Sequence, residues 1–217
     1  MKKEYILFDL DGTITDSAEG IINSLNYAFN KLGIESKSKE ELSVFIGPPL
    51  VDMMMKVYGF SKEKAEQGLL SYREYFREKG IFENRVYDGI VQMLLDLQNE
   101  GYKLVLATSK PEEFAKRILA HFDLAKYFYF IGGSDMEGKR ASKSAVIGYA
   151  LENLGIDNPE KCIMVGDREH DVFGASKFSI DTVGVLYGYG SRTELESAGA
   201  KYIVENVAEL YAVLRSM

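Results

Sequence analysis

Two aspartates, Asp9 and Asp11, stand two residues apart in the segment Asp9-Leu10-Asp11-Gly12-Thr13, directly after an apolar run at residues 5–8. An apolar run that ends in acid and glycine predicts a buried strand opening into a loop, so both carboxylates can face one pocket. Because close carboxylates repel each other, one must share its charge with a metal ion or take up a proton. This division suits a nucleophile beside a general acid and base, although an Asp-Gly turn with local capping gives the same pattern.

A second acidic pair, Asp167 and Asp171, follows the apolar run at residues 162–165. Oxygen ligands of this kind suit Mg²⁺, which prefers a few carboxylates together with water and phosphate oxygens. A helix start at which aspartate interacts favourably with the helix dipole explains the pair equally well. His170 lies between them, but we do not expect zinc, because no second imidazole or thiolate is close by in the sequence.

Hydroxyl and ammonium groups follow two further apolar runs. Thr108-Ser109-Lys110 comes after residues 103–107 and precedes a helix expected from Pro111, and Lys143 opens another expected helix. A hydroxyl and free backbone amides at a helix start can hold a phosphoryl oxygen. Ser or Thr before Pro is also an ordinary helix cap, and a lone lysine is usually solvated. By themselves these residues therefore do not indicate a phosphate site.

Apolar runs alternate with helical patterns over most of the chain. The runs that predict strands are residues 5–8, 103–107, 127–131, 162–165, 182–185 and 202–204. This alternation predicts an α/β fold: a doubly wound, mostly parallel, Rossmann-like sheet with helices on both faces. Ligands of such sheets bind beyond the carboxyl ends of the strands, which is where the candidate residues fall.

The first two expected strands are separated by roughly 95 residues, whereas one crossover unit needs about 30. The surplus is rich in helical patterns, including a Ser38-x-x-Glu41 capping box. We therefore predict a helical cap at residues 16–85, inserted into a core domain formed by residues 1–15 and 86–217. Gly47-Pro48-Pro49 predicts a rigid turn within the cap, and we expect this turn to face the substrate.

Bulk properties exclude several functions. The chain has 217 residues, a formal net charge of −7 and no basic run, which argues against nucleic acid or an anionic membrane as a partner. One cysteine cannot form an internal disulfide, and no apolar stretch has the length of a signal peptide or a membrane span. We expect a cytoplasmic protein.

In this order the segments resemble the haloacid dehalogenase-like (HAD) hydrolase superfamily over nearly the whole chain. Its four motifs correspond to the segment Asp9 to Thr13, to Thr108, to Lys143, and to Gly166-Asp167 with Asp171. A cap between the first and second motifs is typical of one subclass. Three segments look most similar to phosphoglycolate phosphatase-like and nucleotidase-like members, and these are residues 45–50, 108–111 and 166–171.

The resemblance implies a Mg²⁺-dependent phosphoric monoester hydrolase that acts on a small phosphorylated metabolite, with phosphoglycolate or a nucleoside monophosphate expected. It assigns Asp9 as the nucleophile that forms an aspartyl-phosphate and Asp11 as the general acid and base. Thr108 and Lys143 would neutralise the phosphoryl oxygens. The metal residues would be Asp9, Asp11 through its carbonyl, Asp167 and Asp171. The remaining substrate and phosphate contacts would come from Gly12, Thr13, Ser109, Lys110, Gly47 and Pro48.

Two other functions are compatible with the same residues. A β-phosphoglucomutase-like phosphomutase shares the fold, although relatives of that kind often carry valine where Thr13 stands. A non-enzymatic receiver protein also accepts phosphate on an aspartate, but the helical cap and the second acid Asp11 oppose it. The sequence leaves the particular substrate and the oligomeric state open.

Overall fold

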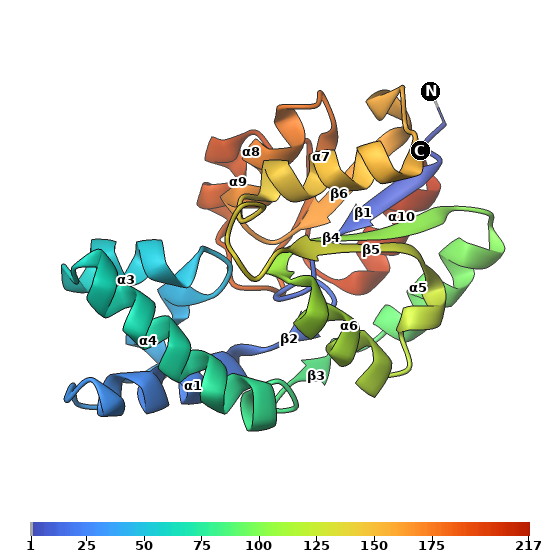
Figure 1. Cartoon of the computed structure of the whole chain (residues 1–217). Helices are drawn as coiled ribbons and strands as arrows, with labels where there is room; N and C mark the ends of the chain where they lie inside the picture. The colour runs from blue at the N-terminus through green and yellow to red at the C-terminus, as the bar shows by residue number, and fades with distance from the viewer. Residues whose placement is uncertain (1) are drawn as a thin grey trace. The chain divides into compact units, whose positions relative to one another are not determined.

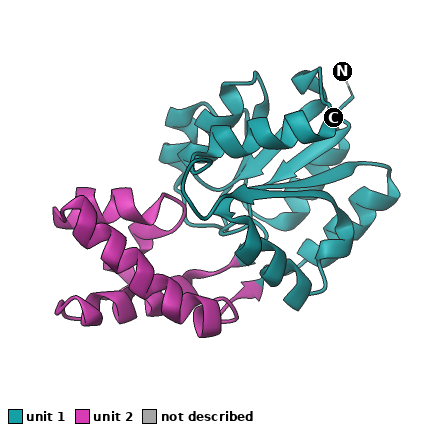
Figure 2. Cartoon of the chain, in the orientation of Figure 1, with its two compact units in different colours: residues 1–15, 86–217 teal, residues 16–85 magenta. Residues whose placement is uncertain are grey.

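A computed structural model describes residues 2–217, and the chain divides into two compact units (Figure 2). Unit 1 is the chain up to Thr15 together with Val86–Met217, and unit 2 is Asp16–Arg85. The chain passes from one unit to the other within two short paired strands, β2 (Thr15–Asp16) and β3 (Arg85–Val86). Each unit has its own buried core.

Unit 1 is built on a six-stranded sheet in the order β5-β4-β1-β6-β7-β8 (Figure 1), in which every pair of neighbours is parallel. The predicted α/β fold with a parallel sheet is confirmed. Because β1 lies between β4 and β6, the direction of winding reverses beside β1, and ligands of such sheets bind at this switch point. The strands are β1 (Tyr5–Phe8), β4 (Lys103–Pro111), β5 (Phe128–Ser134), β6 (Cys162–Gly166), β7 (Asp181–Val185) and β8 (Tyr202–Val204).

Strand β4 is longer than the sequence pattern predicts. The apolar run ends at Ala107, but the strand continues to Pro111, which pairs with Ser134 after a shift in register. Proline disfavours the helical conformation in the residue before it, so Lys110 stays extended. The following helix therefore begins at Glu112, with Pro111 as its cap, rather than at Pro111.

Helices cover both faces of the sheet (Figure 1). Helix α7 packs on β4 and β5 and contacts α8, whereas α5 packs on β4 and contacts α10. Helix α7 follows the cap Ser142 and ends before Gly155. The helices are α5 (Ile90–Asn99), α6 (Glu112–His121), α7 (Lys143–Leu154), α8 (Glu169–Ser176), α9 (Arg192–Ala198) and α10 (Val207–Arg215), with short turns η3 (Ala125–Tyr127) and η4 (Pro159–Lys161).

The core of unit 1 follows from the period of two in its strands. Leu7 and Met164 of neighbouring strands pack with Val146 and Ile147 of α7, all nearly inaccessible to solvent. Burying such side chains contributes about 1.5–3 kcal/mol each. The central strands are thereby held rigidly, and the loops at their carboxyl ends start from fixed positions.

Unit 2 is helical, with an aromatic cluster in which Phe29 contacts Phe45, Tyr58 and Phe60. The predicted capping box of Ser38 and Glu41 is present. The helices are α1 (Ala18–Lys31), α2 (Lys39–Leu42), α3 (Leu50–Tyr58) and α4 (Lys62–Tyr75), with a 3₁₀ turn η1 (Ser43–Phe45) and a π-helical turn η2 (Phe76–Gly80). Across residues 2–217 no helix combines the length and the hydropathy that crossing a membrane requires.

Candidate active site

The loop after β1 holds Asp9 and Asp11 in a tightly bonded turn. The Asp9 amide continues the sheet by donating to the Val165 carbonyl at 2.9 Å, and the Leu10 carbonyl accepts from the amides of three later residues, Thr13, Ile14 and Thr15. Gly12 has φ +81°, and a Cβ there would lie 2.2 Å from Oδ2 of Asp167. Only glycine fits this turn, because a side chain would strain the backbone and collide with the neighbouring carboxylate.

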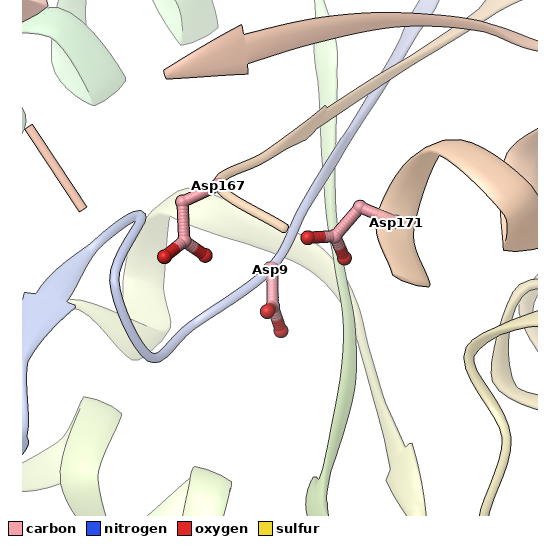
Figure 3. Close-up of side chains that lie close together, drawn as sticks. All are labelled: Asp9, Asp167 and Asp171. Atoms are coloured by element: carbon pink, nitrogen blue, oxygen red, sulfur yellow. The ribbon is translucent and has the colours of Figure 1, made fainter. Parts of the chain in front are cut away.

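Three buried carboxylates meet where β1, β6 and α8 come together (Figure 3). They belong to Asp9, Asp167 and Asp171, and one oxygen from each lies within 4.8 Å of the others. The Lys143 ammonium is 2.7 Å from Asp9 Oδ1 and 2.8 Å from Asp171 Oδ1, and it donates to the Ala107 carbonyl at 3.1 Å. Lys143 therefore links the acidic residues after β1 and β6 to the middle of β4.

Burial dominates the electrostatics of this cluster. It raises the pKa of Asp9 to about 6, with Asp171 and Asp11 adding to the effect and Lys143 opposing it. Burial, together with Asp171 and Asp9, raises the pKa of Asp167 well above its ordinary value. Burial alone would lower the pKa of Lys143, but Asp171 and Asp9 outweigh it and raise that pKa. Crowded carboxylates in a poorly solvated place need a further positive charge to remain ionised together.

The acidic cluster fits a divalent cation. Three carboxylates against one lysine leave two negative charges uncompensated, which one divalent ion would balance. Among the described residues, the buried Oδ1 of Asp167 also accepts no hydrogen bond. Buried polar atoms are rarely left unpaired unless they serve an ion, a water or catalysis. An all-oxygen set with few carboxylates is the kind that Mg²⁺ uses.

Asp11 is not one of the three clustered carboxylates and forms an ion pair of its own. Its Oδ2 is 2.7 Å from the Lys110 ammonium, and both side chains are largely buried. Thr108 is buried, and its hydroxyl accepts from the Lys110 amide at 3.2 Å. The end of β4 thus supplies a hydroxyl and a cation beside the second aspartate.

Most of the predicted site residues come from the carboxyl ends of the strands in unit 1. Thr13 has a buried hydroxyl oxygen that accepts no hydrogen bond within residues 2–217. Ser109 lies beside Thr108 in β4 and is half-buried. Gly47 and Pro48 belong to unit 2, between η1 and α3, and their contact with substrate stays a prediction.

Sequence patterns missed the pair formed by Arg168 and Glu194. Glu194 Oε1 accepts from Arg168 Nε at 2.8 Å and from the Glu169 amide at 2.9 Å. Burial by itself would raise the pKa of Glu194, but these hydrogen bonds outweigh it and lower that pKa. Glu194 therefore anchors the start of α8, which carries Asp171. The Ser191-x-x-Glu194 spacing indicates only the local helix cap.

His170 takes no place in the acidic cluster. Burial lowers its pKa.

Comparison with known proteins shows the family to which the chain belongs. The model of the haloacid dehalogenase-like hydrolase family matches residues 6–185. The chain belongs to this family, as the sequence predicts. The family model spans the acidic loop after β1, the end of β4, Lys143 and the acidic pair after β6.

Individual relatives are similar over most or all of the chain. A Pseudomonas aeruginosa protein named 5′-nucleotidase is 43% identical over 211 residues, 97% of this chain and 95% of its own. Tyrosine-protein kinase PtkA of Mycobacterium tuberculosis is 41% identical over 187 residues, 86% of this chain but only 63% of its own length. The crystal structure of a predicted phosphatase from Clostridium acetobutylicum superposes with a TM-score of 0.97 at 49% identity, covering all of both chains.

Proposed function

We propose that this chain is a Mg²⁺-dependent phosphatase that hydrolyses a small phosphomonoester through an aspartyl-phosphate. The observation that carries the proposal is the buried cluster of Asp9, Asp167 and Asp171 around Lys143, with Asp11 and Lys110 beside it. A nucleoside 5′-monophosphate is the first substrate to test, because the relative at 43% identity is named 5′-nucleotidase. Phosphoglycolate is the second, from the sequence resemblance.

In the proposed chemistry Asp9 is the nucleophile, and Asp11 is first the general acid and then the general base. An oxygen of Asp9 attacks phosphorus, the bond from phosphorus to the leaving oxygen breaks, and Asp11 gives that oxygen a proton. Water then attacks the aspartyl-phosphate, Asp11 takes the proton from this water, and inorganic phosphate leaves with Asp9 restored. Lys110, at 2.7 Å from Asp11, fixes the direction of the second carboxylate.

The cation would be held by Asp9, Asp167 and the Asp11 carbonyl, with Asp171 acting through Lys143 or a water. When bound, it neutralises charge on the phosphoryl group and lets a carboxylate approach an anionic substrate. Lys143 adds a fixed positive charge and orients Asp9. The Thr108 hydroxyl and the backbone amides after Asp9 complete the proposed contacts to the phosphoryl oxygens.

Phosphate release measures the proposed function directly. The purified chain is incubated with a panel of nucleoside 5′-monophosphates, phosphoglycolate, sugar phosphates, pyrophosphate and aryl phosphates, with Mg²⁺ or with excess chelator. We expect release that depends on Mg²⁺ and stops with chelator. No release from any compound, or release that chelator leaves unchanged, would contradict the proposal.

Substitution of Asp167 tests its part in holding the metal. Asp167→Ala removes an oxygen ligand, and we expect the Mg²⁺ concentration for half-maximal activity to rise at least about tenfold. Asp181→Ala is the matched control, since Asp181 begins the next strand and pairs with Lys201 at the surface. An Asp167→Ala titration that coincides with the wild type would remove this residue from the metal site.

A second candidate is phosphoryl transfer to an acceptor other than water. It is favoured by the 41% identity to a protein named tyrosine-protein kinase, and the same Asp9 would carry the phosphoryl group. The two candidates differ in the fate of that phosphoryl group. A hydrolase releases inorganic phosphate, whereas a kinase transfers the group to tyrosine and a phosphomutase returns it to a sugar. Incubation with labelled ATP and a tyrosine-containing polymer, beside the panel above, separates them.

A further inference from the structure

The loop that follows β7, residues 187–190, lies against two parts of the candidate site. The Tyr187 hydroxyl donates to the Thr13 carbonyl at 3.1 Å, and the Tyr189 amide donates to Asp167 Oδ2 at 2.7 Å. One four-residue segment therefore holds both the turn that presents Asp9 and Asp11 and a carboxylate of the acidic cluster. The sequence of this segment, Tyr-Gly-Tyr-Gly, is as typical of a surface turn as of a loop that borders an active site.

The contact to Asp167 decides which oxygen remains available. Oδ2 is occupied by the Tyr189 amide, while Oδ1 is buried and accepts no hydrogen bond among the described residues. A backbone amide cannot rotate away as a side chain can, so the carboxylate is held in one orientation. Oδ1 is thereby left as the oxygen of Asp167 that is available to a cation.

The contact to Thr13 holds the turn that carries Asp9 and Asp11. The Tyr187 ring packs edge-on against Tyr87 with ring centroids 5.0 Å apart, and the Tyr87 amide donates to the Ile14 carbonyl at 3.2 Å. Burial raises the pKa of the Tyr187 phenol, which therefore stays protonated and able to donate. Successive carbonyls of the turn, at Thr13 and Ile14, are thus fixed by two tyrosines that pack together.

Close approach explains the glycine between the two tyrosines. A Cβ at Gly188 would lie 2.3 Å from the Gly12 carbonyl oxygen and 2.4 Å from Asp167 Cβ. The first neighbour is a backbone atom and the second is the Cβ of a buried side chain, so neither can move freely. The loop can reach Thr13 and Asp167 together only when position 188 has no side chain.

We propose that the 187–190 loop is a positioning element of the active site, which orients Asp167 toward the metal through the Tyr189 amide and fixes the turn carrying Asp9 through the Tyr187 hydroxyl. This inference rests on the proposed function. It assigns no chemical step to the loop: Tyr187 and Gly188 are positioning residues, and they act through Asp167 and Thr13.

Two variants test the two contacts separately. Tyr187→Phe removes one hydroxyl, and we expect kcat to fall about five- to tenfold with KM nearly unchanged. Its matched control is Tyr102→Phe, because Tyr102 is a buried tyrosine whose hydroxyl also donates to a backbone carbonyl, that of Leu214 at 3.3 Å. The control should keep kcat within about twofold of the wild type.

Gly188→Ala tests the orientation of Asp167 without using turnover. Mn²⁺ binding to the folded, substrate-free protein is followed by electron paramagnetic resonance, and we expect affinity to weaken at least about tenfold. Gly184→Ala is the control, since the atoms nearest to a Cβ there belong to the Leu195 side chain, the first at 2.8 Å, and not to Asp167. Melting temperatures of all four variants separate a general loss of stability from a loss confined to the site.

The outcomes are distinguishable. Tyr187→Phe with the kinetics of Tyr102→Phe, or Gly188→Ala with the Mn²⁺ affinity of the wild type, overturns the role of the loop. If Gly188→Ala does not fold, the comparison of the two tyrosine variants decides by itself. A wild-type protein that neither binds Mn²⁺ nor releases phosphate overturns the proposed function and the role of the loop together, whereas an active wild type with unaltered variants overturns the loop alone.

Discussion

Asp9→Asn is expected to lower kcat at least about 10³-fold while the fold persists. The amide keeps the shape of the carboxylate but is a far weaker nucleophile, so the phosphoryl group has no acceptor on the protein. The same change removes one charge from a crowded group, since Asp9 lies with Asp167 and Asp171 in one buried cluster. We therefore expect the metal-free variant to melt no lower than the wild type. Initial rates of phosphate release and thermal melts measure both quantities.

Asp181→Asn provides the control for this substitution. Asp181 begins strand β7 of the same sheet, but its carboxylate pairs with Lys201 at the surface. Surface ion pairs contribute little, about 0–1 kcal/mol, so the control should retain nearly full activity. A well-folded Asp9→Asn protein that keeps a substantial part of the wild-type rate would exclude Asp9 as the nucleophile.

Much of this site could be predicted because one simple rule positions it. Asp9, Lys143 and Asp167 all follow apolar strands, or open the helices after them, and the carboxyl ends of parallel strands meet at one edge of a sheet. The strands are recognised from short apolar runs, and the lengths of the intervals between them indicate where helices cross over. Nothing more than strand order is needed to bring such residues together.

Other contacts depend on details that no short pattern encodes. Lys110 reaches Asp11 because β4 continues past its apolar run with a shift in register against β5. The Tyr187 hydroxyl reaches Thr13 across 174 positions of sequence, and the contact depends on the path of one glycine-containing loop. Glu194 anchors Arg168 from a different helix. Each of these needs the three-dimensional course of the backbone, which periodicity and turn residues do not specify.

Asp11→Asn is expected to separate the two halves of the reaction. Loss of a general acid and base costs about 10²–10⁴-fold, and the cost to the first half depends on how much help the leaving group needs. An alkyl phosphate has a basic leaving oxygen, so its turnover should fall by the full amount. An aryl phosphate releases a stable phenolate without protonation, so transfer to Asp9 should continue while hydrolysis of the aspartyl-phosphate stalls.

The expected result with an aryl phosphate is a burst of phenolate close to one equivalent, followed by a slow steady rate. Acid quenching during the slow phase should trap a phosphorylated protein by intact mass, and the double variant Asp9→Asn with Asp11→Asn should carry no adduct. The Lys110 ammonium, 2.7 Å from Asp11 Oδ2, holds the Asp11 carboxylate in place in the wild type. If Asp11→Asn slows alkyl and aryl phosphates equally and accumulates no adduct, Asp11 does not act as the general acid and base, and its buried pair with Lys110 serves only to shape the loop.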